Sequence, residues 1–176
     1  MNTFPRADSL RPKPDLPVTT IIVDDDREIC RAMQALFETE GDIEVLATGY
    51  SAEEAIALAA EHHPQVILLD LHFENGMSGI EAIKQISARA DIKSRVLVYT
   101  ISARESTIFE AIKAGASSYV WKHEGYADLI EAVFTTARGE SFASPTVATM
   151  VLEFLEHPRG EEANELEVKA DPSLGG

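Results

Sequence analysis

Short runs of apolar and mostly β-branched residues recur along the chain and predict buried strands. The run Val66–Leu69 consists of four apolar residues, a pattern typical of a strand that is buried on both faces of a parallel sheet. Asp70 follows it at the expected carboxyl edge of the sheet, where ligands bind in open α/β folds. The five predicted strands cover residues 19–23, 44–48, 66–70, 95–100 and 118–122.

Between these runs, apolar residues recur every three or four positions, which is the spacing of an amphipathic helix. Ser51 and Glu54 form a capping box that begins one helix, and Gly41, Gly115 and Gly139 end others. The predicted helices cover residues 27–40, the stretch from the capping box to Pro64, the stretch after Gly79, and residues 106–114 and 126–138. A further helix is predicted within residues 141–157 from the spacing of Val147, Met150, Val151 and Phe154.

Five strands that alternate with five helices across short connections predict a doubly wound α/β fold with a parallel sheet. This folded domain is expected over residues 18–140. Residues 1–17 contain four prolines and no periodicity, so we expect a disordered leader there. Residues 141–157 are interpreted as a linker helix, and residues 158–176, which are acidic and rich in proline and glycine, as a flexible linker or tail.

Composition narrows the class of protein. The chain has 176 residues, 45% hydrophobic and 26% charged, as expected for one soluble globular domain with tails. No apolar run approaches the roughly 20 residues of a membrane-spanning helix, and the N-terminus lacks the apolar core of a signal peptide. A net charge of −15 disfavours electrostatic binding of nucleic acid by this stretch. Cys30 is the only cysteine, which excludes an intrachain disulfide and favours the cytoplasm.

Polar groups end four of the predicted strands: Asp24–Asp26, Asp70, Thr100 and Lys122. Because parallel strands share their carboxyl edge, these groups are expected close together. Clustered carboxylates repel unless a cation neutralises them, and a shallow oxygen site with few protein ligands suits Mg²⁺. A hydroxyl and an ammonium are what the oxygens of a transferred phosphoryl group need. The central carboxylate is therefore predicted to act as a nucleophile and form an aspartyl phosphate.

The motifs Val23-Asp24-Asp25-Asp26 and Leu68-Leu69-Asp70-Leu71, followed in order by Thr100 and Lys122, resemble the receiver domain of two-component response regulators. The resemblance covers residues 18–140 and implies a flavodoxin-like (βα)5 fold with strand order 2-1-3-4-5. It implies that Asp70 is the phosphoacceptor and that Thr100 and Lys122 bind the phosphoryl oxygens. The implied Mg²⁺ ligands are Asp24, Asp25, Asp70 and the backbone carbonyl of His72.

The resemblance also implies a conformational switch. Thr100 would shift toward the phosphoryl group, and Tyr119 would change rotamer and turn inward. In this family, the residues two positions beyond the phosphoacceptor and two beyond the threonine tune how fast water removes the phosphoryl group. Here these residues are His72 and Ser102. The loop after Asp70 lacks the usual proline and is one residue longer than is typical.

Residues 111–122 and 137–145 are similar to NarL/FixJ-type (LuxR-type) regulators, which carry a helix-turn-helix output domain after a linker. The similarity implies a sensor histidine kinase as partner, a possible homodimer on activation, and contact with DNA only through such an output domain. No such domain is present by Gly176. The chain is therefore expected to be a truncated receiver or a stand-alone receiver that acts through protein contacts or a phosphorelay.

Other functions fit the pattern less well. An aspartyl-phosphate hydrolase also uses a strand-end aspartate with Mg²⁺, but it needs a second acid two residues further on, where this chain has His72. A nucleotide-binding domain would carry a glycine-rich phosphate loop, and neither G-x-G-x-x-G nor G-K-[ST] occurs. A receiver that works unphosphorylated is disfavoured because all the required groups are present. We therefore expect a phosphoacceptor rather than an enzyme.

Overall fold

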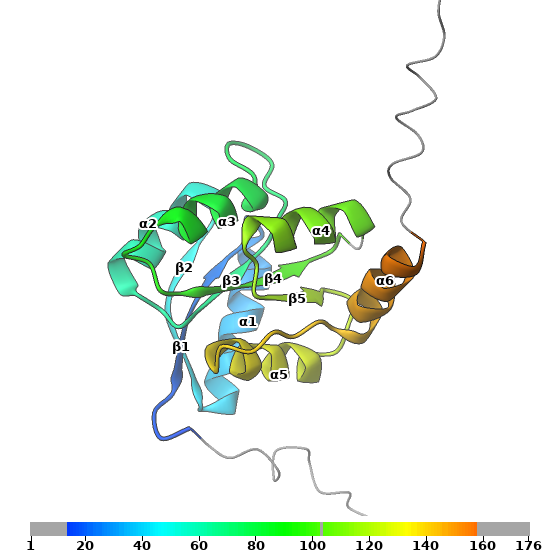
Figure 1. Cartoon of the computed structure of the whole chain (residues 1–176). Coiled ribbons are helices and arrows are strands. Elements are labelled where there is room, and N and C mark those ends of the chain that lie inside the picture. Colours follow the sequence, from blue (N-terminus) through cyan, green and yellow to red (C-terminus); the bar gives the residue numbers. More distant parts are fainter. Residues whose placement is uncertain (1–13, 103, 158–176) are drawn as a thin grey trace, which may run out of the picture.

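Helices cover both faces of a single parallel sheet with the strand order β2-β1-β3-β4-β5 (Figure 1). The computed structural model describes residues 14–102 and 104–157. The strands are β1 (Val18–Val23), β2 (Ile43–Gly49), β3 (Val66–Leu69), β4 (Arg95–Thr100) and β5 (Ser118–Trp121). The helices are α1 (Arg27–Glu40), α2 (Ala52–His62), α3 (Gly79–Ala88), α4 (Glu105–Ala114), α5 (Tyr126–Ala137) and α6 (Pro145–Glu156). The predicted fold class, the strand order and the additional C-terminal helix are confirmed.

Successive residues of the central strands enter two different cores. Ile21, Ile67 and Val96 pack on the side of α2, α3 and α4, whereas Ile22 and Leu68 pack with α1 and α5. The alternation follows from strand geometry, since neighbouring side chains point to opposite faces. Because both faces are covered, β3 is apolar throughout and fully buried, as its sequence predicts.

Polar side chains cap the first turns of α1, α2 and α3, whereas α4, α5 and α6 have no side-chain cap. The Asp26 carboxylate accepts from the backbone N–H groups of the first turn of α1, and Ser51 accepts from the N–H of Glu54 at 3.2 Å. Only this half of the expected capping box forms. The Glu54 carboxylate accepts instead from the N–H of Tyr50, one residue before the cap. Asp26 lies three residues after the end of β1 and Ser51 two residues after the end of β2, so these caps also set the short turns at the carboxyl edge of the sheet.

The segment after α5 differs from the expected linker helix. Residues 141–144 are not helical: the N–H of Tyr119 donates to Phe142 O at 2.8 Å, and the N–H of Ser144 donates to Tyr119 O at 3.0 Å. This short stretch therefore pairs with the exposed edge of β5, and the helix begins only at Pro145. Edge pairing satisfies backbone groups that a helix beginning at Ser141 would leave open on β5.

Helix α6 packs against the domain instead of standing apart from it. Val147 is buried in the core that α4 and β5 share, and the rings of Phe109 and Phe154 lie 4.1 Å apart between centroids. Figure 1 shows α6 beside α4 and β5. The helix thus covers part of the surface formed by α4 and β5.

Two expectations fall largely outside the described residues. Most of the predicted leader, residues 1–13, and the whole predicted acidic tail, residues 158–176, belong to the parts of the chain that are not described. Within residues 14–102 and 104–157, no helix is both long enough and apolar enough to cross a membrane.

Candidate functional site

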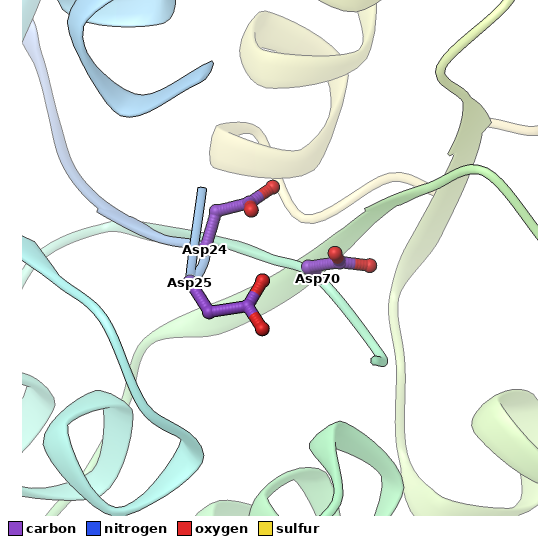
Figure 2. Close-up of side chains that lie close together, drawn as sticks. All are labelled: Asp24, Asp25 and Asp70. Carbon is purple, nitrogen blue, oxygen red and sulfur yellow. The ribbon is translucent and has the colours of Figure 1, made fainter. Parts of the chain in front are cut away.

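Two acidic residues become neighbours because the strands before them are paired in register. Val23, the last residue of β1, lies beside Leu69, the last residue of β3. The next residues along the chain are Asp24 and Asp70, and the Asp70 N–H donates to Val23 O at 3.0 Å. Asp24 and Asp70 are 3% and 6% exposed, so the fold brings two carboxylates into a nearly buried position (Figure 2).

The three acids after β1 have different surroundings. Asp24 Oδ1 accepts from the N–H of Asp26 at 2.9 Å, and the Asp26 side chain caps α1. Asp25 is exposed and accepts from the N–H of Glu74 at 3.1 Å, so it contacts the loop after β3. Asp24 and Asp25 thus lie beside Asp70 (Figure 2), whereas Asp26 stabilises the helix.

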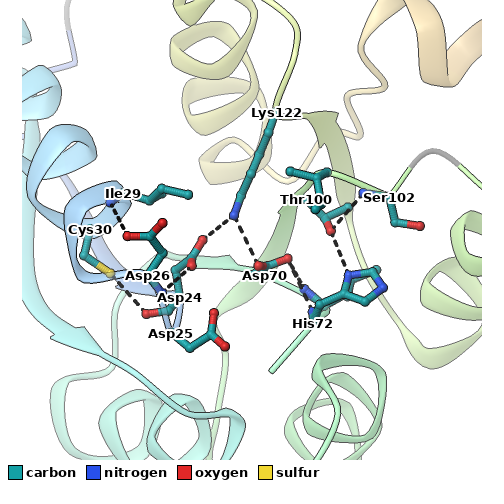
Figure 3. Close-up of polar contacts among 12 residues, drawn as sticks. Asp24, Asp25, Asp26, Ile29, Cys30, Asp70, His72, Thr100, Ser102 and Lys122 are labelled. Atoms are coloured by element: carbon teal, nitrogen blue, oxygen red, sulfur yellow. Dashed lines mark hydrogen bonds and ion pairs between the residues drawn. The ribbon is translucent and has the colours of Figure 1, made fainter. Parts of the chain in front are cut away.

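Lys122 joins the two buried carboxylates. It follows β5 and forms ion pairs with Asp24 and with Asp70, the latter at 3.2 Å (Figure 3). Burial raises the pKa of Asp24, and the hydrogen bond from Lys122 offsets only part of that effect. For Lys122, burial alone would lower the pKa, but the hydrogen bond to Asp24 and the charge of Asp70 outweigh burial and the pKa is raised. The ammonium therefore stays charged throughout the neutral pH range.

The carboxylate of Asp70 is oriented from both sides. Its Oδ1 accepts from the backbone N–H groups of Leu71 at 2.7 Å and His72 at 3.4 Å, and its Oδ2 faces Lys122. Backbone donors and an ammonium therefore fix the side chain at the centre of the strand-end cluster.

Thr100 lies on the other side of Asp70 and is fully buried at the end of β4. Its Oγ1 accepts from the N–H of Ser102 at 3.3 Å and lies 3.3 Å from Nδ1 of His72 (Figure 3). The contact with the imidazole was not predicted, because the only role expected of His72 within the site itself was that of a metal ligand through its backbone carbonyl. That role for the carbonyl stays a prediction.

Tyr119 is already turned inward in this structure. Its side chain is 3% exposed, lies in the core with α4, and donates from the hydroxyl to Ser102 O at 3.0 Å. Burial and then the charge of Asp70 raise the pKa of the Tyr119 hydroxyl, so it keeps its proton and remains a donor. Tyr119 is therefore buried in this structure, and its change of rotamer on phosphorylation stays a prediction.

The loop between β3 and α3, residues 71–78, is held by carboxylates from other elements. Asp25 accepts from the N–H of Glu74, and Glu53 on α2 accepts from the N–H of Met77 at 2.9 Å. Gly76 has a positive φ of 84°, and a Cβ there would lie 2.8 Å from the Glu53 carboxylate. The loop lacks the usual proline, and it is held by these contacts instead. The contribution of Glu53 was not predicted.

The acidic strand-end groups and Lys122 line an open cleft of about 390 Å³ that also includes Phe73, Glu74 and Ile101, whereas the buried Thr100 is not part of its lining. Ligand oxygens of Asp24, Asp25 and Asp70 all lie within 4.8 Å of one another. Three carboxylate oxygens with one side open to water fit a hard divalent cation such as Mg²⁺, which keeps several waters. The residues present therefore fit the metal that receiver domains bind at their acidic pocket.

The comparisons with known proteins agree on one family. The model of the response regulator receiver domain matches residues 20–134. The transcriptional regulatory protein LiaR of Bacillus subtilis is 35% identical over 146 residues, which cover 83% of this chain and 68% of LiaR. The response regulator protein VraR of Staphylococcus aureus is 36% identical over 133 residues, which cover 75% of this chain and 62% of VraR. The match thus spans only about two thirds of each relative's length.

Solved structures give the same result. A two-component response regulator of the LuxR family from Aurantimonas sp. SI85-9A1 superposes with a TM-score of 0.75 at 28% identity, over 80% of this chain and 99% of that chain. The receiver domain of the putative regulator NarL from Mycobacterium tuberculosis has a TM-score of 0.67 at 22% identity, over 71% of this chain and 99% of that one, and shares the fold. The sequence matches cover nearly all of the sheet and its helices, and they establish that this chain belongs to the family of response regulator receiver domains.

Proposed function

We propose that this receiver accepts a phosphoryl group on Asp70 from a sensor histidine kinase in the cytoplasm. The observation that carries the proposal is the position of Asp70, which lies between the ammonium of Lys122 and the carboxylates of Asp24 and Asp25. Asp24, Asp25, Asp70 and the backbone carbonyl of His72 would hold Mg²⁺. When bound, the ion would neutralise the clustered acids and the charge of the incoming phosphoryl group.

In the transfer step, a carboxylate oxygen of Asp70 attacks the phosphorus of a phosphohistidine. The new P–O bond forms as the P–N bond breaks, and the imidazole leaves with the electron pair of that bond. Lys122, now paired with Oδ2 of Asp70, is placed to contact the transferred group. The product is an acyl phosphate, which water can later hydrolyse.

Thr100 would sense the product through its hydroxyl. Its Oγ1 already accepts from the N–H of Ser102, and the hydroxyl has one proton of its own that it can donate. When His72 carries its proton on Nε2, Thr100 donates to Nδ1, and a phosphoryl oxygen competes for the same proton. The Thr100 hydroxyl would therefore stop donating to His72 and donate to a phosphoryl oxygen instead. The buried Tyr119, which donates to Ser102 O, would support the resulting arrangement of Ser102.

The output would be a change in the surface formed by α4, β5 and α5, with a modest rise in self-association through that surface or through the neighbouring α1 and α5. Control of transcription would require a DNA-binding output domain like that of the related regulators, and a receiver acting alone through protein contacts or a phosphorelay is the alternative. Because α6 covers part of the α4–β5 surface, a homodimer there would have to include or displace this helix.

Incubation with acetyl phosphate and Mg²⁺ tests the proposal. Intact mass should show one phosphoryl group on the wild-type chain and none on Asp70→Asn. Asp26→Ser is a matched control, because it removes a neighbouring acid while serine still caps the helix. Equal phosphorylation of wild type and Asp70→Asn would refute the assignment. Continuous release of many phosphates per chain at a rate typical of enzymes would support the hydrolase alternative instead.

A further inference from the structure

Two aromatic side chains of β5 bind consecutive carbonyl groups just after Thr100. The hydroxyl of Tyr119 donates to Ser102 O at 3.0 Å, and the indole Nε1 of Trp121 donates to Ile101 O at 3.0 Å. Tyr119 and Trp121 are two positions apart in a strand, so their side chains leave the same face of the sheet. Both side chains therefore reach the same segment from the same side.

Trp121 is also the neighbour of Thr100 within the sheet. Their Cα atoms are partners in the β4–β5 register, and the N–H of Lys122 donates to Thr100 O at 2.9 Å. The backbone of Thr100 is thus fixed to β5, and the indole fixes the next peptide. Since the N–H of Ser102 donates to the Thr100 hydroxyl, the orientation of this segment decides where that hydroxyl lies.

The hydrogen bond, more than packing, connects Trp121 with this segment. Ile101 is 62% exposed, so the residue offers its carbonyl to the indole while little of it is covered by other side chains. The indole is half-buried, and its ring lies 4.8 Å from that of His123, between centroids. Removing the N–H while keeping the ring would therefore isolate the contact with Ile101.

We propose that Trp121 is a positioning residue for phosphoryl binding at Asp70. Its indole N–H holds the carbonyl of Ile101 and so stabilises the arrangement in which Thr100 contacts Ser102 and Tyr119 is buried. This inference rests on the proposed function, in which the phosphoryl group favours that same arrangement. Without the N–H, the segment populates other arrangements, and part of the phosphoryl-binding free energy is spent on restoring the productive one.

The chain contains one tryptophan, so a biosynthetic replacement affects Trp121 alone. Benzothienylalanine keeps the size and aromaticity of the side chain and lacks the N–H donor. In saturating Mg²⁺, the Kd for beryllofluoride, measured by isothermal titration calorimetry, should rise about three- to fivefold, as expected for the loss of one neutral hydrogen bond. Trp121→Phe should show the same direction of change.

A merely structural role of Trp121 would weaken Mg²⁺ binding together with beryllofluoride binding, whereas the positioning role weakens beryllofluoride binding alone. The Kd for Mg²⁺ alone should stay that of wild type in both variants, because the acidic ligands follow β1 and β3. Tyr119→Phe, which removes the neighbouring donor, should also weaken beryllofluoride binding. Tyr50→Phe is the matched control: its hydroxyl contacts Thr48 at 3.3 Å, away from the segment, and its removal should leave beryllofluoride binding unchanged.

The possible failures can be told apart. If the benzothienylalanine protein binds beryllofluoride as tightly as wild type, the N–H has no positioning role and the inference is overturned. A parallel loss of Mg²⁺ affinity would equally overturn it, because the defect would then be general. If wild type and Asp70→Asn bind beryllofluoride alike, the proposed function itself fails.

Discussion

The two loops that flank Asp70 are held in opposite ways. In the β3–α3 loop, backbone N–H groups donate to the carboxylates of Asp70, Asp25 and Glu53. In the segment after β4, backbone carbonyls accept from the neutral donors Tyr119 and Trp121. Charge therefore controls the first loop, so metal binding and pH should act on it. The second should respond mainly to the hydrogen bonds of the Thr100 hydroxyl.

The largest effect is expected from removing the Lys122 ammonium, which neutralises the two buried carboxylates. Lys122→Met would leave Asp24 and Asp70 buried beside each other without their cation. Removing one partner of a buried ion pair costs about 3 kcal/mol, so urea unfolding without Mg²⁺ should show a loss of that order. Added Mg²⁺ should restore part of the stability. Lys84→Met, at an exposed position, is the control. An equal and small loss of stability in both variants would show that Lys122 does not neutralise the buried carboxylates in the way proposed.

The hydroxyl of Thr100 connects the two loops, since it contacts both His72 and Ser102. Beryllofluoride should raise self-association of the wild-type chain modestly, and Thr100→Ala should abolish that rise, while Thr100→Ser should retain most of it. Sedimentation velocity with and without beryllofluoride measures the change. An unchanged wild-type mass at high concentration would rule out dimerisation without affecting the phosphoacceptor assignment.

A smaller effect is expected at Glu53, far from the reacting atoms. Its carboxylate holds the N–H of Met77 and thereby the loop that contains His72. Glu53→Ala should raise the Kd for Mg²⁺ about threefold, the size expected for losing one hydrogen bond that orders the loop. Glu53→Gln keeps an acceptor oxygen and should bind Mg²⁺ nearly as wild type does. Calorimetry that gives equal affinities for all three proteins would show that the loop does not need this contact.

The smallest effect is a dependence on pH. The backbone hydrogen bond from Met77 lowers the pKa of Glu53 below its ordinary value. A carboxylate whose pKa is lowered on folding contributes stability above its unfolded pKa, and loses it as the pH falls through the folded value. The amide NMR signal of Met77 should therefore shift in acid, with a midpoint below about 4.3, the ordinary pKa of glutamate. A midpoint at or above that value would contradict the charged hydrogen bond.

The two loops also differ in how far the sequence predicted them. Strand ends follow from hydrophobic patterning, so the pattern alone predicts Asp24, Asp70, Thr100 and Lys122 at one edge of the sheet. The contacts that hold the loops join residues far apart in the sequence, such as Glu53 with Met77 and Trp121 with Ile101. No local periodicity encodes such pairs, because they depend on how the helices and strands pack in three dimensions.

The C-terminal segment shows the same limit. The apolar spacing of residues 147–154 correctly indicated a helix, because the period of a helix is visible locally. Nothing local to residues 141–144 indicated that they would pair with the edge of β5, since that depends on a strand edge over twenty residues earlier. The range of the expected linker helix, residues 141–157, therefore begins four residues before the observed helix, which starts at Pro145.

The central claim is that Asp70 carries the phosphoryl group, and reductive trapping tests it most directly. Borohydride converts an aspartyl phosphate into homoserine, and tandem mass spectrometry locates the changed residue. After acetyl phosphate and Mg²⁺, we predict homoserine at position 70 and unchanged aspartates at positions 24, 25 and 26. Homoserine at one of those three positions, or none at position 70, would contradict the account.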